Sequence, residues 1–314
     1  MKSSAIAVSG LRKAYGDKVV LDGIDLEVAA GTVFSLLGPN GAGKTTAVNV
    51  LATLLRPDAG TVYVGGHDVV TATREVRAVI GVTGQFAAVD ELLSGRENLR
   101  MMADLRRVRD GGRVVAGLLE RFQLVESADK LVSTYSGGMR RKLDLAMTLV
   151  GRPRIIFLDE PTTGLDPRSR RTMWEIVREL VADGTTIFLT TQYLDEADQL
   201  ADRIAVLDRG RLVAEGTPEE LKRQVPGGHV RLQFNDVRQL DAAEHRLALS
   251  TVTRDDEALV LQIPSDGSIP ALRAVLDVLE GSGIQAEALT MHTPDLDDVF
   301  LALTGRTDAE VISK

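Results

Sequence analysis

The sequence predicts an α/β fold centred on a phosphate-binding loop, followed by a small α+β domain. A mostly apolar strand is predicted over residues 32–37 and a helix over residues 46–55. Residues 38–45 join them and read Gly-Pro-Asn-Gly-Ala-Gly-Lys-Thr, which fits the pattern G-x-x-x-x-G-K-T. Strand, glycine-rich loop and helix form the context in which that pattern holds phosphate. A second strand that ends in two acids and a later Ser-Gly-Gly motif support the same fold.

The residue types of this loop explain how it would bind a nucleotide. Its glycines let successive backbone N–H groups turn inward, and the helix N-terminus adds the positive end of its dipole. Lys44 would reach the β- and γ-phosphates of ATP, and the Thr45 hydroxyl would hold Mg²⁺. The alternative is a chance glycine turn with a surface lysine, which the remaining motifs argue against. The residues predicted to contact the nucleotide here are Gly38, Pro39, Asn40, Gly41, Ala42, Gly43, Lys44, Thr45 and Thr46.

A second buried strand, predicted over residues 154–159, supplies the other half of a hydrolytic site. It ends in Asp159, and Glu160 follows directly. Asp159 would bind Mg²⁺ through water, opposite Thr45. Glu160 lies one residue beyond this ligand, where a carboxylate can polarise the attacking water. The alternative for Asp159 is a helix cap or turn acid, and the alternative for Glu160 is a solvated turn glutamate.

A third motif indicates the family. Ser136, Gly137 and Gly138 precede a helix predicted over residues 139–150. A serine and backbone N–H groups at a helix start form a second anion site. Together with the two nucleotide motifs at this spacing, the motif makes the chain resemble the ATP-binding subunits of ABC transporters, in which Ser-Gly-Gly belongs to the signature motif. The resemblance covers residue 5 to about residue 222.

The resemblance implies roles for further residues. Tyr15 lies where the family stacks an aromatic ring on adenine, although a plain core or surface tyrosine is the alternative. Gln85 falls in the loop that touches Mg²⁺ or the attacking water and senses the membrane partner; an ordinary exposed glutamine is its alternative. Asp166 belongs to the loop that crosses to a second subunit. Ser136 and Gly138 face the nucleotide of the other subunit, so that two copies sandwich two ATP molecules.

One position departs from the family pattern. A strand predicted over residues 186–191 is followed by Gln192, where the family usually has histidine. Histidine can donate a hydrogen bond and titrate, whereas a glutamine amide can donate but cannot carry a proton. We expect the γ-phosphate contact to survive this exchange. The catalytic set that the resemblance implies is Lys44, Gln85, Glu160 and Gln192, with Thr45, Gln85 and Asp159 around Mg²⁺.

Details within and beyond these motifs narrow the resemblance to the daunorubicin/doxorubicin-resistance type. They lie in residues 60–62, 135–141, 190–194 and 296–301. This branch implies a separate multi-spanning permease that makes most cargo contacts, with antibiotics, lipids and other amphipathic molecules as cargo. A lipid or polyketide-lipid exporter is the rival within transport. A soluble ABC ATPase acting on ribosomes or DNA is the rival from another class, but such proteins usually carry twin ATPase units or long coiled-coil insertions.

The sequence predicts two domains, residues 1–224 and 225–314, with a helical subdomain at about residues 88–150. Residues 224–314 hold 7 Lys and Arg and 15 Asp and Glu, which accounts for the whole net charge of −8. Nucleic-acid partners favour a basic face, so this acidic domain argues against them. A merely solvated acidic surface is the alternative. Residues 225–228, Val-Pro-Gly-Gly, are predicted to form a linker or turn.

Helical periodicity in the subdomain predicts a core face. Leu92, Leu99, Met102 and Leu105 fall on one side of a helical stretch between residues 89 and 124. We expect this lobe to form a groove with the Gln85 loop, in which a short permease helix docks.

The second domain has the element order βαββαβ, which predicts a ferredoxin-like layer of sheet and helices. A closing helix is predicted over residues 295–303. Its Asp297 and Asp298 indicate a capped helix start rather than a metal site, because acids favour the positive helix end. The strands are predicted over residues 229–234, 250–253, 258–263 and 284–289, and the helices over residues 237–247 and 269–279.

The composition of the chain and its N-terminal residues indicate where in the cell the protein is expected. The chain has no Cys, no signal-like N-terminus and no apolar run of roughly 18 to 20 residues. We therefore expect a cytoplasmic protein that lies on the cytoplasmic face of the cell membrane.

Overall fold

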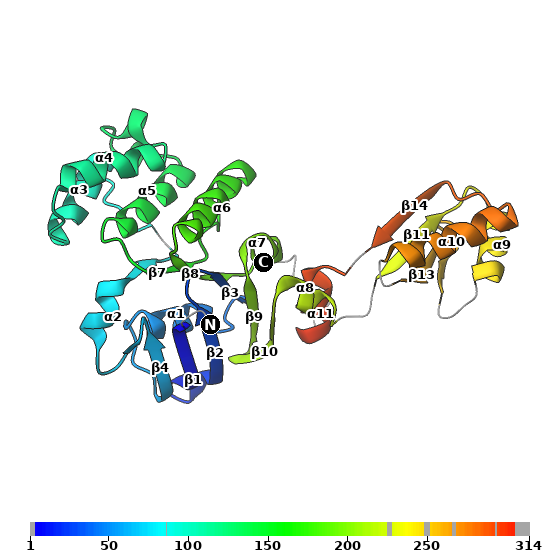
Figure 1. Cartoon of the computed structure of the whole chain (residues 1–314), viewed down its shortest axis with the longest axis horizontal. Coiled ribbons are helices and arrows are strands. Elements are labelled where there is room, and N and C mark those ends of the chain that lie inside the picture. The colour runs from blue at the N-terminus through cyan, green and yellow to red at the C-terminus, as the bar shows by residue number, and fades with distance from the viewer. Residues whose placement is uncertain are drawn as a thin grey trace. The chain divides into compact units, whose positions relative to one another are not determined.

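The computed structural model of the chain describes residues 4–85, 87–224, 228–247, 252–265, 268–292 and 294–304. The chain forms two compact units, unit 1 (residues 1–218) and unit 2 (residues 219–314) (Figure 1). The boundary between the units falls slightly before the predicted one at residue 224. Residues 225–227 of the predicted linker lie outside the described residues.

Unit 1 contains two sheets and most of the helices. Its strands are β1 (Ser4–Tyr15), β2 (Lys18–Ala29), β3 (Val33–Leu37), β4 (Ala59–Val64), β5 (His67–Asp68), β6 (Ile80–Thr83), β7 (Ile155–Asp159), β8 (Thr186–Thr191), β9 (Arg203–Asp208) and β10 (Arg211–Gly216). Its helices are α1 (Lys44–Leu51), α2 (Thr73–Val79), α3 (Gly95–Leu105), α4 (Gly111–Arg121), α5 (Gly137–Leu149), α6 (Pro167–Ala182) and α7 (Leu194–Leu200), with 3₁₀ turns η1 (Val125–Ser127) and η2 (Val132–Thr134). Helix α8 (Pro218–Lys222) begins at the unit boundary.

The central sheet brings the predicted site residues to one edge. Its strand order is β10-β9-β3-β8-β7-β6, and all neighbours from β9 to β6 run parallel. Every residue of β3, β7 and β8 is buried. Leu37 at the end of β3 pairs with Thr191 of β8, and Asp159 of β7 pairs with Thr190. The loops that follow these three strands therefore leave the sheet side by side, where ligands bind in open parallel sheets.

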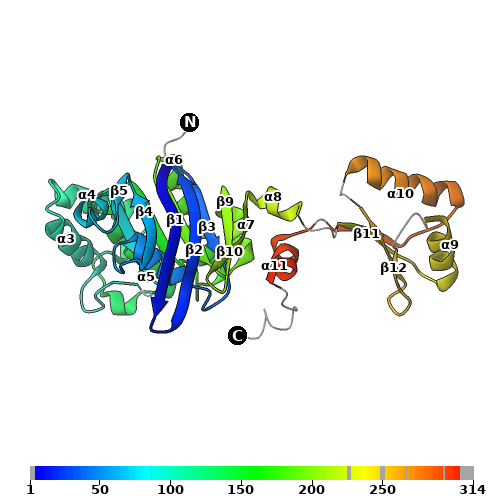
Figure 2. The same ribbon diagram turned by 90° about the horizontal axis from the view of Figure 1, so that it is seen from below.

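Unit 1 also contains a smaller antiparallel sheet. Its strand order is β2-β1-β4-β5, and the long β1–β2 hairpin lies beside β4 in Figure 2. Helix α1 packs in the same apolar cluster as this sheet, through buried residues such as Val48 and Leu51. The helix ends at Leu51, short of the predicted residue 55, because Thr53 takes a left-handed φ of 63° that no α-helix continues.

Helices α3, α4 and α5 form a lobe at the end of unit 1 away from β1 and β2 (Figure 1). The predicted core face is only half correct: Leu99 is fully buried and Met102 half-buried, but Leu92 and Leu105 are 84% and 72% exposed. Leu92 precedes the helix, because Ser94 and Glu97 form a capping box that starts α3 at Gly95. Leu105 is the last residue of α3, beyond the packed face.

Unit 2 contains a four-stranded antiparallel sheet, ordered β12-β13-β11-β14. This is the arrangement of a ferredoxin-like layer with the βαββαβ element order. Val230 and Leu232 of the sheet pack against Leu240 and Leu279 of the helices. The elements are β11 (His229–Gln233), α9 (Val237–Leu247), β12 (Thr253–Asp255), β13 (Val260–Pro264), α10 (Ile269–Ser282), β14 (Ala288–His292) and α11 (Leu296–Thr304).

Three strands of unit 2 begin later than predicted, among them β13, which begins at Val260 and not at residue 258. The last strand was expected from Ile284, but the Ile284 amide still donates to Leu279 O and closes the C-terminus of α10. Gly283, with φ 67°, makes this helix ending possible. In the hairpin, β12 begins at Thr253; predicted strand residues 250–251 lie outside the described residues.

The start of α11 is capped as predicted. Asp298 N donates to Asp295 Oδ1 at 3.0 Å, and Asp295 N donates to Asp298 Oδ2 at 3.0 Å. His292 also contacts Asp298, with 3.1 Å between Nε2 and Oδ2. These bonds engage Asp298 in the helix start.

Within the described part of the chain, no helix has both the length and the apolar character that a membrane span needs.

Candidate active site

The phosphate-binding loop connects β3 to α1 and packs closely on two other strands. A Cβ atom on Gly38 would lie 2.3 Å from the Leu207 carbonyl oxygen of β9. Gly43, the N-cap of α1, has φ 113°, and its Cβ would lie 2.9 Å from the Val20 carbonyl oxygen of β2. Both positions therefore require glycine, and the loop backbone is held in one conformation at the N-terminus of α1.

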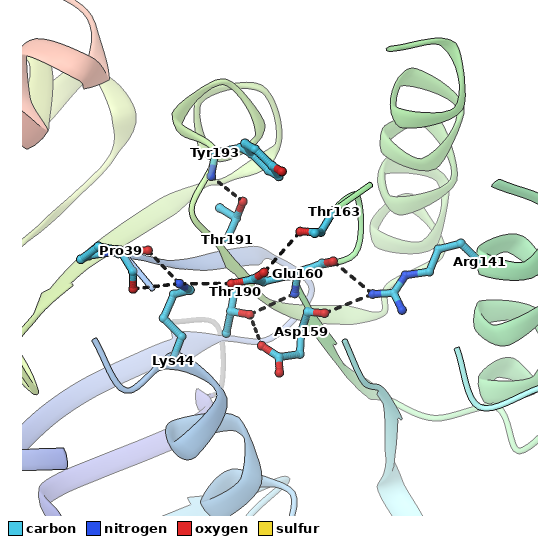
Figure 3. A network of polar contacts seen from close by, with 10 residues as sticks. Pro39, Lys44, Arg141, Asp159, Glu160, Thr163, Thr190, Thr191 and Tyr193 are labelled. Atoms are coloured by element: carbon cyan, nitrogen blue, oxygen red, sulfur yellow. Dashed lines mark hydrogen bonds and ion pairs between the residues drawn. The ribbon is translucent and has the colours of Figure 1, made fainter. Parts of the chain in front are cut away.

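Lys44 is buried at the centre of the site. Its ammonium donates to Gly38 O at 2.8 Å and to Pro39 O at 3.1 Å. It also forms an ion pair with Glu160, with 3.2 Å between Nζ and Oε1 (Figure 3). Burial lowers the pKa of Lys44, and the carboxylates of Glu160 and Asp159 oppose that shift. The structure thus brings the predicted phosphate-binding lysine and the predicted base into direct contact.

Thr190 fixes the two acids relative to each other, and it was not among the predicted site residues. Its hydroxyl donates to Asp159 Oδ1 at 2.5 Å and accepts from Glu160 N at 3.1 Å. The signal in the sequence is the pair Thr190-Thr191, two polar residues that end an otherwise apolar strand. Figure 3 shows Thr190 between the two acids.

Glu160 adopts a backbone conformation that is uncommon for a residue with a side chain. Its φ is 48°, in the left-handed region, and the residue is 8% exposed. A non-glycine residue there costs about 1–3 kcal/mol, and such strain concentrates at functional sites. The Glu160 side chain accepts a hydrogen bond from Thr163 Oγ1 at 3.3 Å in addition to its Lys44 contact. Surrounding contacts therefore hold this carboxylate in place.

The residues predicted to hold Mg²⁺ carry suitable donor atoms. Thr45 is exposed in the first turn of α1. One carboxylate oxygen of Asp159 accepts a hydrogen bond from the Thr190 hydroxyl. Figure 3 shows the second carboxylate oxygen pointing away from that hydroxyl. Hydroxyl and carboxylate oxygens are the hard donors that Mg²⁺ prefers.

The signature residues lie at the start of α5. Ser136 is its N-cap and accepts a hydrogen bond from Met139 N at 3.3 Å. Ser136 and Gly137 are exposed. Gly138 backs onto α6, because a Cβ there would lie 2.6 Å from Ser169 Oγ. Among the described residues, no hydrogen bond or ion pair joins this turn to the phosphate-binding loop.

Asp166 caps the neighbouring helix α6. It accepts from Ser169 Oγ at 2.6 Å and from the amides of Arg168 and Ser169 at 3.0 Å each. The Ser169 hydroxyl and these amides lower the pKa of Asp166. Since Ser169 also contacts Gly138, the signature turn and the predicted crossing loop are packed together.

Three further predicted site residues, among those that the structure describes, make no hydrogen bond to this centre. Tyr15 ends β1, is 50% exposed and has the Lys13 ammonium 5.8 Å from its ring centroid. Gln85 is exposed just after β6. Gln192 is half-buried and follows β8, at the sheet edge that carries Glu160.

The chain matches the ABC transporter family over residues 21–163. It is 52% identical over 307 residues to the daunorubicin resistance ATP-binding protein DrrA3 of Streptomyces coeruleorubidus, an alignment that covers 97% of each chain. The chain belongs to the ATP-binding subunits of ABC transporters. As such a subunit it is an ATPase coupled to transport, and its predicted family and fold class are confirmed.

Other relatives of this ABC subunit agree with that assignment. The Nod factor export ATP-binding protein I of Rhizobium sp. (strain N33) is 38% identical, with 98% of this chain and 99% of that protein aligned. A solved ATP-binding subunit of an ABC transporter is similar with a TM-score of 0.64 and 27% identity, covering 70% of this chain and 92% of that one. A nucleotide-free cassette gives a TM-score of 0.64 and 26% identity, covering 70% and 94%.

Proposed function

We propose that this ABC subunit binds and hydrolyses MgATP to drive efflux of a drug-like or amphipathic molecule through a separate integral-membrane permease. It would act as a homodimer on the cytoplasmic face of the cell membrane, with no nucleic-acid partner. The observation that carries the catalytic part is the buried contact between Lys44 and Glu160 at the end of β7.

The geometry suggests how hydrolysis would proceed. Phosphate oxygens compete with Glu160 for the Lys44 ammonium, so ATP binding would release the carboxylate. Glu160 would then accept the proton of the attacking water, while Gln192 donates to the γ-phosphate and Gln85 orients the water. Mg²⁺, held by Thr45 and Asp159 with Gln85 nearby, would neutralise charge on the phosphates.

A second copy would complete the site. Ser136 and Gly137 are exposed at the start of α5, where a helix N-terminus and free N–H groups attract anions. We propose that this turn and Asp166 meet the nucleotide held by the other copy. Tyr15 would stack on the adenine, since half of its surface is exposed.

The cargo class rests on the relatives' names. Those named for daunorubicin or doxorubicin resistance are 43–52% identical, and those named for Nod factor export are 36–39% identical. The higher identity favours a drug-like cargo over the lipid-exporter alternative. The permease would make most cargo contacts.

Reconstitution tests this proposal. The chain would be co-purified with a candidate multi-spanning permease and placed in vesicles, with ATPase rate and daunorubicin accumulation measured together. We expect the drug to stimulate hydrolysis and to accumulate in the vesicles only when ATP is present. With the Lys44→Ala variant we expect neither stimulation of hydrolysis nor accumulation of the drug. Stimulation by a lipid but not by the drug would favour the rival cargo, and ATPase stimulated only by nucleic acid would contradict export.

A further inference from the structure

Helix α5 carries a buried pair of opposite charges that the hydrolytic mechanism does not use. Arg141 is 6% exposed and Asp144 is 3% exposed. Their side chains form an ion pair one helical turn apart, with 3.6 Å between Nη1 and Oδ2. Burying two charges is costly unless other polar groups satisfy them, so their partners indicate what the pair does.

Arg141 binds the backbone of the catalytic loop. Nε donates to Pro161 O at 2.9 Å, and Nη2 donates to Asp159 O at 3.1 Å and to Glu160 O at 3.3 Å. Figure 3 shows the guanidinium pointing at the Asp159 and Glu160 carbonyls from the side opposite Lys44. One rigid planar group thus holds three consecutive peptide units that include the base and the predicted Mg²⁺ ligand.

The same pair holds both ends of the Gln85 loop. Arg141 Nη1 donates to Gly84 O at 2.6 Å, on the N-terminal side of Gln85. Asp144 Oδ1 accepts from Ala88 N at 3.1 Å, on the C-terminal side. A displacement of either end must therefore displace a side chain of α5.

We propose that Arg141, supported by Asp144, is a positioning residue that couples the Gln85 loop to the backbone of Glu160. The inference rests on the proposed function, in which the Gln85 loop responds to the permease. A guanidinium has five donors in a fixed fork, so movement of Gly84 changes the bonds to Asp159, Glu160 and Pro161. Because Ser136 caps the same helix, the coupling extends to the anion site offered to the second copy.

The chain offers a matched control on the same helix. Arg140 donates to Ser133 O at 2.9 Å and pairs with Glu91 at 2.8 Å between Nη1 and Oε1. Both partners lie in the helical lobe, away from the Glu160 loop. Arg140→Met therefore removes an arginine from α5 without touching the proposed coupling.

The first experiment compares Arg141→Met, Arg141→Lys and Arg140→Met in the complex with the permease. For Arg141→Met we expect ATP affinity close to that of the parent but a stimulation of hydrolysis by permease and cargo reduced by about 2- to 30-fold, the usual range for a coupling residue. Arg141→Lys should recover part of the stimulation, because an ammonium reaches fewer of the carbonyls. Arg140→Met should retain the parental stimulation of hydrolysis by permease and cargo. Equal stimulation in Arg141→Met and parent would overturn the inference.

A double variant guards against misfolding, since Arg141→Met alone leaves the buried Asp144 carboxylate unpaired. Arg141→Met combined with Asp144→Leu removes both charges, a change that buried pairs often tolerate. We expect this variant to fold and bind ATP but to remain uncoupled. Parental stimulation in the double variant would show that the pair only fills space.

A second readout needs no permease and so separates this inference from the proposed function. In the isolated chain carrying Glu160→Gln, ATP binding should change hydrogen exchange at the Ala88 amide. The change should disappear when Arg141→Met is added and persist when Arg140→Met is added. A parental response with Arg141→Met would overturn the coupling. Failure of the permease to stimulate the parent would instead count against the proposed function alone.

Discussion

The charged side chains at the site of unit 1 are buried, whereas the carboxylates around Arg254 of unit 2 are exposed. In unit 1, Lys44, Arg141 and Glu160 are at most 8% exposed, and each meets a charged partner inside the fold. In unit 2, Arg254 contacts carboxylates whose side chains are 43–71% exposed; these are Asp241, Glu244 and Asp256. Buried charges are costly and their loss is strongly felt, whereas exposed pairs contribute little. The difference teaches that charge changes should matter at the buried site of the first unit and hardly at all at the exposed Arg254 cluster of the second.

The largest effect is expected at Glu160. Glu160→Gln keeps the shape of the side chain but removes the proposed base, so ATP should still bind while hydrolysis falls by about 10²- to 10⁴-fold. The measurement is steady-state ATPase rate beside equilibrium ATP binding. A variant that hydrolyses ATP at the parental rate would show that Glu160 is not the base.

The next effect is expected at Gln192. Gln192→Ala removes one proposed donor to the γ-phosphate, and the loss of such a donor typically lowers the rate by about 10²- to 10³-fold. Gln192→His should remain active and add a pH dependence near a pKa of about 6.5, the ordinary value for histidine, beyond the pH dependence of the parent. ATPase rates between about pH 5.5 and 8.5, measured with the permease, check both outcomes. Full activity of the alanine variant would mean that Gln192 takes no part.

A smaller effect concerns Asp144, whose pKa burial raises from 3.8 to about 6 against the opposing effects of the Ala88 amide and Arg141. A carboxyl that is easier to protonate in the folded state adds stability below its unfolded pKa, and this contribution is lost as pH rises through about 6. The free energy of unfolding of the parent, relative to Asp144→Asn, should therefore fall by about 2–3 kcal/mol as pH rises from about 4 to 8. Denaturant titrations of both proteins measure this, and a difference that stays constant with pH would contradict it.

The smallest effect is expected at Arg254, whose exposed ion pairs in unit 2 contrast with the buried pairs of unit 1. Its three carboxylate partners raise its pKa, yet the group is accessible to solvent. Arg254→Ala should leave ATPase rate unchanged and shift the thermal midpoint far less than Arg141→Met, which removes a buried partner. A larger loss of stability for Arg254→Ala than for Arg141→Met would reverse the comparison.

The parts of the site that could be predicted from the sequence are those set by local patterns. The strand over residues 186–191 and the loop ending in Lys44 follow from apolar runs and glycine spacing. The bridging role of Thr190 could not be predicted, because it depends on β7 lying beside β8. The left-handed φ of Glu160 likewise depends on contacts between distant segments.

Arg141 and Leu92 illustrate the same limit. Arg141 was part of a recognised motif, but its carbonyl partners come from two other loops far away in the sequence. Leu92 satisfied the helical period, but the period does not reveal that the cap at Ser94 starts the helix after it.

The central claim is that each hydrolytic site is divided between two copies of the chain. Lys44→Ala damages the phosphate-binding side, and Ser136→Arg damages the signature side. In a mixed dimer of these two inactive variants, one site carries both lesions and the other carries neither. The direct measurement is the ATPase rate of the mixture, after subunit exchange has been demonstrated with labelled chains. The account predicts that the mixture recovers activity which neither variant has alone, and an inactive mixture with proven exchange would contradict it.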